Sequence, residues 1–205
     1  MADKRRVRMT GQERREQLLD VGRALFAERG FEAASIEEIA QRAKITKPVI
    51  YEHFSGKEGL YAVIVHREVQ RLLGRITEAL DATQPRAMLE QAACAFLSYI
   101  EEEQDGFRIL VRDSPVTSTS GTLASLIGDM ASQVEYIFVA EFKERGFNPK
   151  LAPLYSHALV GMVALVGQWW LDVRKPSRDQ VAAHLVNLAW NGLSDLEQDP
   201  RLSQT

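Results

Sequence analysis

Residues 35–58 read SIEEIAQRAKITKPVIYEHFSGKE and carry several signals for the beginning of a helix. Ser35 and Glu38 have the spacing of a capping box, in which the hydroxyl accepts a hydrogen bond from a free helical amide and the acid accepts one from the amide of the cap. Ser55 and Glu58 repeat that spacing, so a second helix is predicted to begin there. The residues between these two entrances leave room for one short helix.

That short helix is predicted over residues 47–54. Thr46 is a suitable N-cap, and Pro48 fits the first turn, where a missing amide hydrogen costs nothing. Ile50 and Phe54 are one helical turn apart and are expected to face a core. A neighbouring arc stays exposed for contact, and it carries Lys47, Tyr51 and Glu52.

Two further helices complete a small N-terminal domain. Thr10 and Glu13 form another capping box, and Gly30 ends the long helix that this box opens. The predicted buried side of that helix consists of Leu18, Gly22, Leu25 and Phe26. The helix after Ser35 has one apolar stripe, made of Ile36, Ile39, Ala40 and Ala43. Three such helices, the last short and exposed, are typical of a helix-turn-helix unit that reads DNA.

At these residues the chain resembles the TetR family of bacterial transcription regulators, whose N-terminal domain carries the pattern written here as FxxxGFEAASIEEIAQRAKITKPVIYEHFSGKEGL. The resemblance is close over residues 12–60. It implies an all-helical DNA-binding domain at this end of the chain. It also implies DNA contacts for Ser35, Thr46, Lys47, Pro48, Tyr51, His53 and Lys57.

The resemblance gives each part of this surface a role. Residues 46–48 are expected at the entrance to the major groove, and Tyr51 and His53 are expected to touch phosphate or base edges. Lys57 and the N-terminus of the next helix are expected to hold a phosphate. The chemistry agrees, because a helix N-terminus offers free amides and partial positive charge. Lys47 can donate hydrogen bonds to guanine.

Other interpretations exist for three of these residues. Taken alone, Lys47 is better interpreted as a solvated surface lysine and His53 as a residue that flanks a turn, but the surrounding pattern reverses this and favours DNA contact. Glu52 is repelled by phosphate unless it accepts a hydrogen bond from cytosine N4 or turns toward a basic side chain. The sequence does not decide between these two interpretations of Glu52.

Charge is distributed unevenly along the chain of 205 residues, whose formal net charge is −3. Residues 1–57 carry 12 Lys or Arg against 9 Asp or Glu, whereas residues 58–205 carry 13 against 19. We therefore expect a DNA-binding domain over residues 1–57 and a ligand-binding and dimerisation domain over residues 58–205. The chain opens with basic residues, which form either a flexible arm that binds phosphate or a solvated tail. They are Lys4, Arg5, Arg6, Arg8, Arg14 and Arg15, of which Arg5 and Arg6 are predicted DNA contacts.

Cysteine content and hydropathy point to a cytoplasmic protein. Cys94 is the only cysteine, so no intramolecular disulfide can form. Residues 1–10 lack the apolar stretch of a secretory signal. The most apolar stretch, residues 158–171, is shorter than the roughly 20 residues needed to cross a bilayer and is expected to be a buried helix. We expect a cytoplasmic location and no membrane partner.

The second domain is predicted to be helical throughout. Caps, glycines and prolines separate helices over residues 57–82, 86–104, 107–112, 122–145, 148–173 and 177–196. Asp105 and Gly106 are expected to separate two of these helices. Residues 114–121 collect Ser, Thr, Pro and Gly and are expected to form a mobile loop. The predicted fold class is all-α, with about nine helices.

The stretch ALVGMVALVGQWWL, residues 158–171, is apolar on every side of a helix. A domain of this size cannot easily bury such a helix alone, so one side is expected to pack against a second copy of the chain. Gly161 and Gly167 are expected to permit close approach. The predicted dimer interface consists of Gly161, Leu165, Trp169, Leu185, Leu188 and Trp190. A two-fold pair would present two reading helices to a palindromic operator.

Aromatic and flexible side chains on the interior side predict a cavity for a lipophilic molecule, although such a stripe is also typical of an ordinary core. The predicted lining is Phe96, Tyr99, Phe107, Leu110, Val111, Phe138, Phe142, Met162, Val166 and Trp170. The stretches AFLSYIEEEQDGFRIL, ALVGM, WWLD and LAWNGL resemble TetR-type regulators that sense long-chain acyl-CoA in actinobacterial fatty-acid metabolism. That resemblance implies an acyl-CoA effector but transfers no particular ligand contact.

Together these features predict a transcription regulator that binds operator DNA as a homodimer and responds to a ligand. A repressor that its ligand releases is the default, and an activator is the alternative. A helical enzyme is the rival class. The four histidines form neither an HExxH motif nor a close Cys/His spacing for a metal, and no GxSxG elbow or phosphate-binding glycine loop occurs. We expect no catalytic activity, no cofactor and no metal.

Overall fold

The computed structural model describes residues 9–112, 123–198 and 200–201. The helices are α1 (Gly11–Ala33), α2 (Ile36–Ala43), α3 (Lys47–His53), α4 (Lys57–Ala79), α5 (Pro85–Glu102), α6 (Gln104–Val111), α7 (Leu123–Glu144), η2 (Pro149–Leu151), α8 (Ala152–Val173) and α9 (Arg178–Ser194). The described residues contain no strand, so the all-α prediction of about nine helices is confirmed. Arg5 and Arg6 of the predicted arm, and the predicted loop at 114–121, lie outside the described residues.

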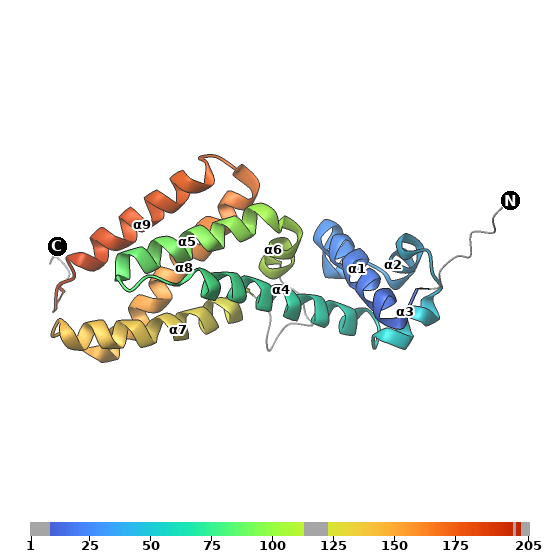
Figure 1. The fold of residues 1–205 in the computed structure, drawn as a ribbon, viewed down its shortest axis with the longest axis horizontal. Helices are drawn as coiled ribbons and strands as arrows, with labels where there is room; N and C mark the ends of the chain where they lie inside the picture. Colours follow the sequence, from blue (N-terminus) through green and yellow to red (C-terminus); the bar gives the residue numbers. More distant parts are fainter. Residues whose placement is uncertain (1–8, 113–122, 199, 202–205) are drawn as a thin grey trace.

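The molecule is elongated, with two groups of helices joined by one long helix (Figure 1). Helices α1, α2 and α3 gather at one end and, with the beginning of α4, form what we call the reading head, residues 9–64. The remaining helices and the rest of α4 form the bundle, residues 65–198. Helix α6 packs against both α1 and α4, so it lies at the junction of the two groups.

The first helix of the reading head begins where the sequence predicts and is broken at the predicted Gly30, beyond which α1 continues to Ala33. The Glu13 amide donates to Thr10 Oγ1 at 3.2 Å and the Thr10 amide donates to Glu13 Oε2 at 2.7 Å, so this capping box is complete. Gly30 interrupts the regular helix with a φ of 79°, which glycine adopts without a steric penalty. The centre of the head is almost fully buried, and it contains Leu18, Leu25, Phe26, Ile39, Ile50 and Leu60.

Two predicted capping boxes differ from expectation. Ser35 accepts a hydrogen bond from the Glu38 amide at 3.2 Å, but the Glu38 carboxylate pairs with arginines of α1 and α2 instead of the cap. The box predicted for Ser55 and Glu58 is wrong. Gly56, with a φ of 99°, redirects the chain and is itself the N-cap of α4, so Ser55 comes one residue too early to cap the helix.

The bounds of the bundle helices follow the prediction except around α6. Asp105 and Gly106 lie inside α6, and the break between α5 and α6 occurs at Glu103, which has a φ of −119° and a ψ of 48°. Gly106 is buried, and a Cβ built there would lie 1.9 Å from Oε2 of Glu68. The glycine therefore makes room for a buried carboxylate and does not separate helices.

Helix α8 is apolar and covered on one side only. Within the part of the chain that the structure describes, Pro149–Val173 is the one helical stretch long and apolar enough to span a membrane by length and composition, and 28% of its most apolar window is buried. A Cβ on Gly167 would lie 2.4 Å from Cε1 of Phe96, so this glycine allows α8 to approach α5 within one chain and not, as predicted, a second chain. Leu165 and Trp169 are 61% and 51% exposed. The expectation of a buried helix therefore holds for one side.

Candidate nucleic-acid interface and effector cavity

The exposed side of α3 is the candidate DNA-reading face. Ile50 and Phe54 point into the core, as predicted, with exposed fractions of 0% and 6%. The exposed residues are Thr46, Lys47, Pro48, Tyr51 and Glu52. Tyr51 is 58% exposed despite its aromatic ring. Thr46 is the N-cap by position, but its hydroxyl makes no capping hydrogen bond and is left for another partner.

Of the two charged residues on this face, Lys47 has an ion-pair partner and Glu52 has none among the described residues. Lys47 forms an ion pair with Glu37 of α2, and hydrogen bonding to Lys47 lowers the pKa of the Glu37 carboxyl. Both partners are exposed, so the pair is weak and DNA phosphate can displace it. Glu52 has no ion-pair partner among the described residues. In the DNA-free protein Glu52 therefore does not turn toward a basic side chain.

Lys57 is tied to the backbone of the reading head. Its Nζ donates to the carbonyl oxygens of Phe31, Ala34 and Glu32 at 2.9, 3.1 and 3.4 Å, and it lies 4.2 Å from the centroid of the Phe31 ring. An ammonium has three protons, so all of its donors have partners. Lys57 thus holds the turn between α1 and α2 against α4. Its phosphate contact stays a prediction, and the sequence does not show this structural role because the carbonyls belong to a distant turn.

The N-terminus of α4 is open to an anion. Gly56 provides no side-chain hydrogen bond, so the first amides of α4 lack a side-chain partner and can receive a phosphate. His53 is half-buried, and its carbonyl accepts a bond from Arg15 Nη1 at 3.2 Å. Arg15 also packs over the Phe54 ring, 4.5 Å from its centroid, so it supports the end of α3 and does not belong to a free arm. The Ser35 hydroxyl accepts the hydrogen bond that caps the N-terminus of α2.

A cavity of about 370 Å³ lies among α4, α5, α7, α8 and α9. Its lining includes residues near the ends of α4, α7 and α9, and these helix ends lie at the side of the bundle away from the head (Figure 1). Its wall is mostly apolar and includes Leu73, Ile76, Leu80, Leu89, Phe96, Phe138, Phe142, Leu159, Val163 and Trp190. Glu141 of α7 and Arg145, the residue after that helix, are the charged residues of the lining. Arg145 donates to the carbonyls of Leu193 and Ser194 at 3.0 and 2.8 Å and so closes the end of α9. Such a wall suits a largely apolar molecule.

Of the predicted lining residues, Phe96, Phe138 and Phe142 lie in the wall of this cavity. The other seven do not line it and instead pack in or against the core, namely Tyr99, Phe107, Leu110, Val111, Met162, Val166 and Trp170. Phe107 packs edge-on against Phe96 with ring centroids 5.6 Å apart, and Trp170 Nε1 donates to the Pro176 carbonyl at 2.8 Å. The prediction missed the wall residues of α4, although their apolar spacing at Leu73, Ile76 and Leu80 was a usable signal.

An exposed apolar face runs along α8 and α9. More than half of each large side chain on it is accessible, and these are Leu154, Leu165, Trp169 and Leu188. A Cβ on Gly161 would meet open space, so this glycine also lies at the surface. Leu185 is buried in the chain's own core and Trp190 lines the cavity, so both side chains have contacts within one chain, and their place in a dimer interface stays a prediction. Trp190 is two positions beyond Leu188, about 200° around the helix, so the two point to opposite sides.

A helix-turn-helix head, joined by one long helix to a second helical bundle, is the architecture of a DNA-binding transcription regulator. Residues 18–64 match the family described as bacterial regulatory proteins, tetR family, and residues 75–203 match the tetracyclin repressor-like C-terminal domain. The chain therefore belongs to the TetR family of transcription regulators, as the sequence patterns predicted. The two matched stretches are separated by a gap that falls within α4.

Named relatives place the chain near regulators from actinobacteria. It is 32% identical over 189 residues to the HTH-type transcriptional activator FasR of Mycolicibacterium smegmatis, covering 91% of this chain and 86% of that protein. It is 37% identical over 190 residues to the HTH-type transcriptional repressor KstR2 of Rhodococcus jostii, covering 88% and 91%. A TetR-like transcriptional regulator from Rhodococcus sp. RHA1 superimposes with a TM-score of 0.77 at 26% identity, covering 92% of this chain and all of that one.

Proposed function

We propose that this protein binds a palindromic operator as a homodimer and responds to a lipophilic effector such as a long-chain acyl-CoA. In the default form of the proposal the protein is a repressor, and binding of the effector releases it from operator DNA. Since one relative is named an activator and another a repressor, activation is the alternative. The proposal includes a cytoplasmic location without a membrane partner and no catalytic role, because the family consists of transcription regulators.

The observation that carries the proposal is that α4 belongs to both sites. Near its beginning, Leu60 and Ile64 pack so closely on α1 that a Cβ on Gly22 would lie 3.1 and 3.0 Å from them. Near its end, Leu73 and Ile76 form part of the cavity wall. A ligand that prefers one position of α4 therefore biases the reading head. By thermodynamic linkage, operator DNA must change the effector's affinity by the same factor.

Support for the homodimer comes from the exposed apolar face of α8 and α9. A second copy placed by two-fold symmetry would cover Leu165, Trp169 and Leu188 and present two α3 helices to half-sites about 34 Å apart, or a multiple of that distance. Sedimentation velocity with the Leu165→Glu, Leu188→Glu double variant tests this. A monomer with lost operator affinity is expected, while a wild-type sedimentation coefficient would place the interface elsewhere.

DNA binding is tested by selecting bound fragments from random duplex DNA. A palindromic consensus is expected, and its affinity should fall with salt by a log–log slope of about −0.9 per phosphate neutralised. Retention of no fragment at low salt would remove the DNA-binding role of this chain. A consensus with a single half-site would remove the dimeric part of the proposal while leaving the reading face intact.

The effector is tested by fluorescence anisotropy of the selected operator with and without oleoyl-CoA. Weaker binding is expected for a repressor and tighter binding for an activator. Ala92→Phe places a ring in the cavity wall and should abolish the response, whereas Ala140→Phe, at an exposed position of α7, should keep it. No change in wild-type affinity at saturating oleoyl-CoA would exclude this effector and leave the DNA-binding part of the proposal standing.

A further inference from the structure

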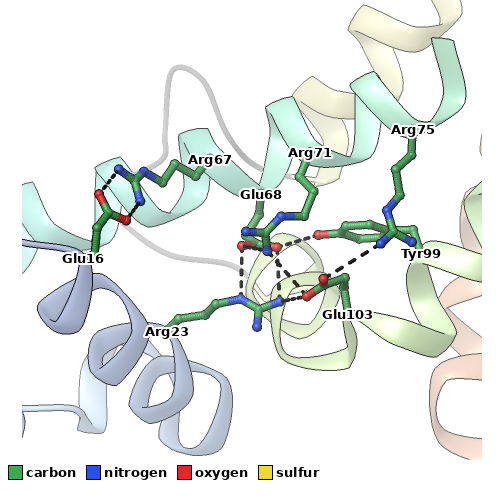
Figure 2. Close-up of polar contacts among 8 residues, drawn as sticks. All are labelled: Glu16, Arg23, Arg67, Glu68, Arg71, Arg75, Tyr99 and Glu103. Atoms are coloured by element: carbon green, nitrogen blue, oxygen red, sulfur yellow. Dashed lines mark hydrogen bonds and ion pairs between the residues drawn. The ribbon is translucent and has the colours of Figure 1, made fainter. Parts of the chain in front are cut away.

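A buried carboxylate lies where the reading head meets the bundle (Figure 2). Glu68 of α4 is only 2% exposed, although nothing in the cavity or the reading face uses it. It accepts hydrogen bonds from Arg23 Nε at 3.0 Å, from Arg71 Nη1 at 2.9 Å and from the Tyr99 hydroxyl at 2.8 Å. These donors belong to α1, α4 and α5, so one carboxylate joins the head to two helices of the bundle.

The charges around Glu68 balance one another. Arg23 also donates to Glu103 Oε2 at 2.6 Å, and Glu103 marks the break between α5 and α6. Burial alone would lower the pKa of Arg23, but the charges of Glu68 and Glu103 outweigh it and raise that pKa. Burial and the neighbouring carboxylate raise the pKa of Tyr99, so its hydroxyl remains a donor. Arg23 and Tyr99 therefore keep the protons that they donate to the carboxylates.

Gly106 of α6 leaves the space that the Glu68 carboxylate occupies. A Cβ at this position would lie 1.9 Å from Glu68 Oε2 and 2.8 Å from Arg23 Nη2. Even an alanine would therefore displace the carboxylate, the guanidinium or α6 itself. The glycine shows that the contact between α4, α1 and α6 is matched closely in shape as well as in charge.

A second tie joins α6 to the reading head at another point of α1. Arg112, the C-cap of α6, donates from Nη1 to the carbonyl oxygens of Ala27 at 2.8 Å and Phe26 at 3.4 Å. These carbonyls lie in the last turn before Gly30 interrupts α1. The Arg112 side chain therefore binds α1 about one helical turn away from Arg23, the residue through which the buried network contacts the same helix.

We propose that Glu68 and Arg112 are positioning residues for DNA reading, because they fix α1, and with it α3, in one orientation relative to α4 and α6. The Glu68 carboxylate and the Arg112 side chain hold α1 at two different points, so α1 cannot rotate about one contact without breaking the other. Charged hydrogen bonds are directional, whereas apolar contacts between helices tolerate sliding. Burying these charges costs desolvation that a purely apolar junction would avoid, so the gain lies in orientation more than in affinity. The inference rests on DNA binding by the head and not on the identity of the effector.

Pulsed electron–electron double resonance between two spin labels measures this orientation directly. One label goes on Cys94, which is exposed on α5, and the other on Gln41→Cys, exposed on α2. Dilution with unlabelled protein suppresses distances between copies. Gly106→Ala should broaden or shift the distance distribution, whereas Gly74→Ala, where a Cβ meets nothing within 4 Å, is the matched control and should leave it unchanged.

Arg112→Ala decides the outcome if Gly106→Ala fails to fold, since Arg112 is exposed and its loss leaves the core intact. The distance distribution between the two labels should broaden in Arg112→Ala. In Arg112→Lys it should be narrower than in Arg112→Ala. We also expect operator affinity to fall about tenfold in Arg112→Ala with an unchanged unfolding temperature. A wild-type distribution in Arg112→Ala and in any folded Gly106→Ala would overturn the inference. Failure of the wild-type chain to bind any DNA would instead defeat the proposed function, while the distances would still decide whether the two ties hold the head.

Discussion

The reading head and the bundle bury apolar side chains in different ways. The head draws its centre from one continuous stretch of chain, in which Leu25 and Ile50 are fully buried. The bundle collects its wall from residues between Leu73 and Leu196 and leaves a cavity of about 370 Å³ among them. A rigid head suits the reading of a DNA groove, and a cavity inside the bundle suits the binding of a small molecule. The contrast teaches that both regions bury apolar side chains, while the bundle also encloses a cavity that can receive a ligand.

A matched pair of leucine truncations tests this contrast with the largest expected effect. Leu25→Ala removes a fully buried side chain of the head and should lower the free energy of unfolding by about 2–5 kcal/mol. Leu159→Ala removes a half-buried side chain that already faces the cavity, so it should cost less than half as much. Urea unfolding followed by tryptophan fluorescence and circular dichroism measures both. Equal losses would contradict the difference in packing.

A pair of glycine substitutions on α8 separates the interior of the bundle from its exposed face. Gly167→Ala forces a methyl group against the Phe96 ring and should cost about 1–3 kcal/mol, seen as a lower unfolding temperature of the isolated chain. Gly161→Ala meets open space and should leave that temperature equal or higher, because alanine favours the helix. A loss of stability in Gly161→Ala, together with weaker self-association, would show instead that the exposed face is closely packed in the dimer.

Lys57→Ala tests whether this lysine serves the head or the DNA. Loss of its bonds to the carbonyls of Phe31 and Ala34 leaves buried acceptors unpaired and should lower stability by about 1–3 kcal/mol in thermal unfolding. Operator affinity should fall as well, because the turn between α1 and α2 loosens. Unchanged stability with weaker binding to every DNA sequence would instead restore the predicted phosphate contact as the main role of Lys57.

Lys47→Ala should have the smallest effect on stability and the clearest effect on recognition. Its ion pair with Glu37 joins two exposed side chains, so no change in unfolding temperature is expected. Repeating the DNA selection with this variant should change the preferred bases of the half-site, because lysine can donate to guanine in the major groove. An unchanged consensus with uniformly weaker binding would make Lys47 a phosphate contact.

Sequence patterns predicted the head better than the cavity. The capping box of Thr10, the break at Gly30 and the inward side of α3 are confirmed, because each depends on residues within a few positions of one another. The box at Ser55 failed although its spacing was correct, since Gly56, with a positive φ, is the N-cap of α4 in place of Ser55. Asp105 and Gly106 resemble a helix break in the sequence, but the structure places both inside α6. The role of Gly106 depends on Glu68, which lies in another helix, so the sequence around Gly106 does not show it.

The sequence by itself determined the helical fold and the approximate helix bounds, because hydrophobic periodicity and caps act over distances of one or two helical turns. It also indicated the family, through the resemblance of one continuous motif over residues 12–60. Only the tertiary structure decided which apolar residues surround space and which fill it. It also decided that Lys57 holds a turn and that a buried acid ties the head to the bundle. The physical reason is that burial and pairing depend on side chains from helices far apart in the chain, whose relative depth and rotation no local pattern contains.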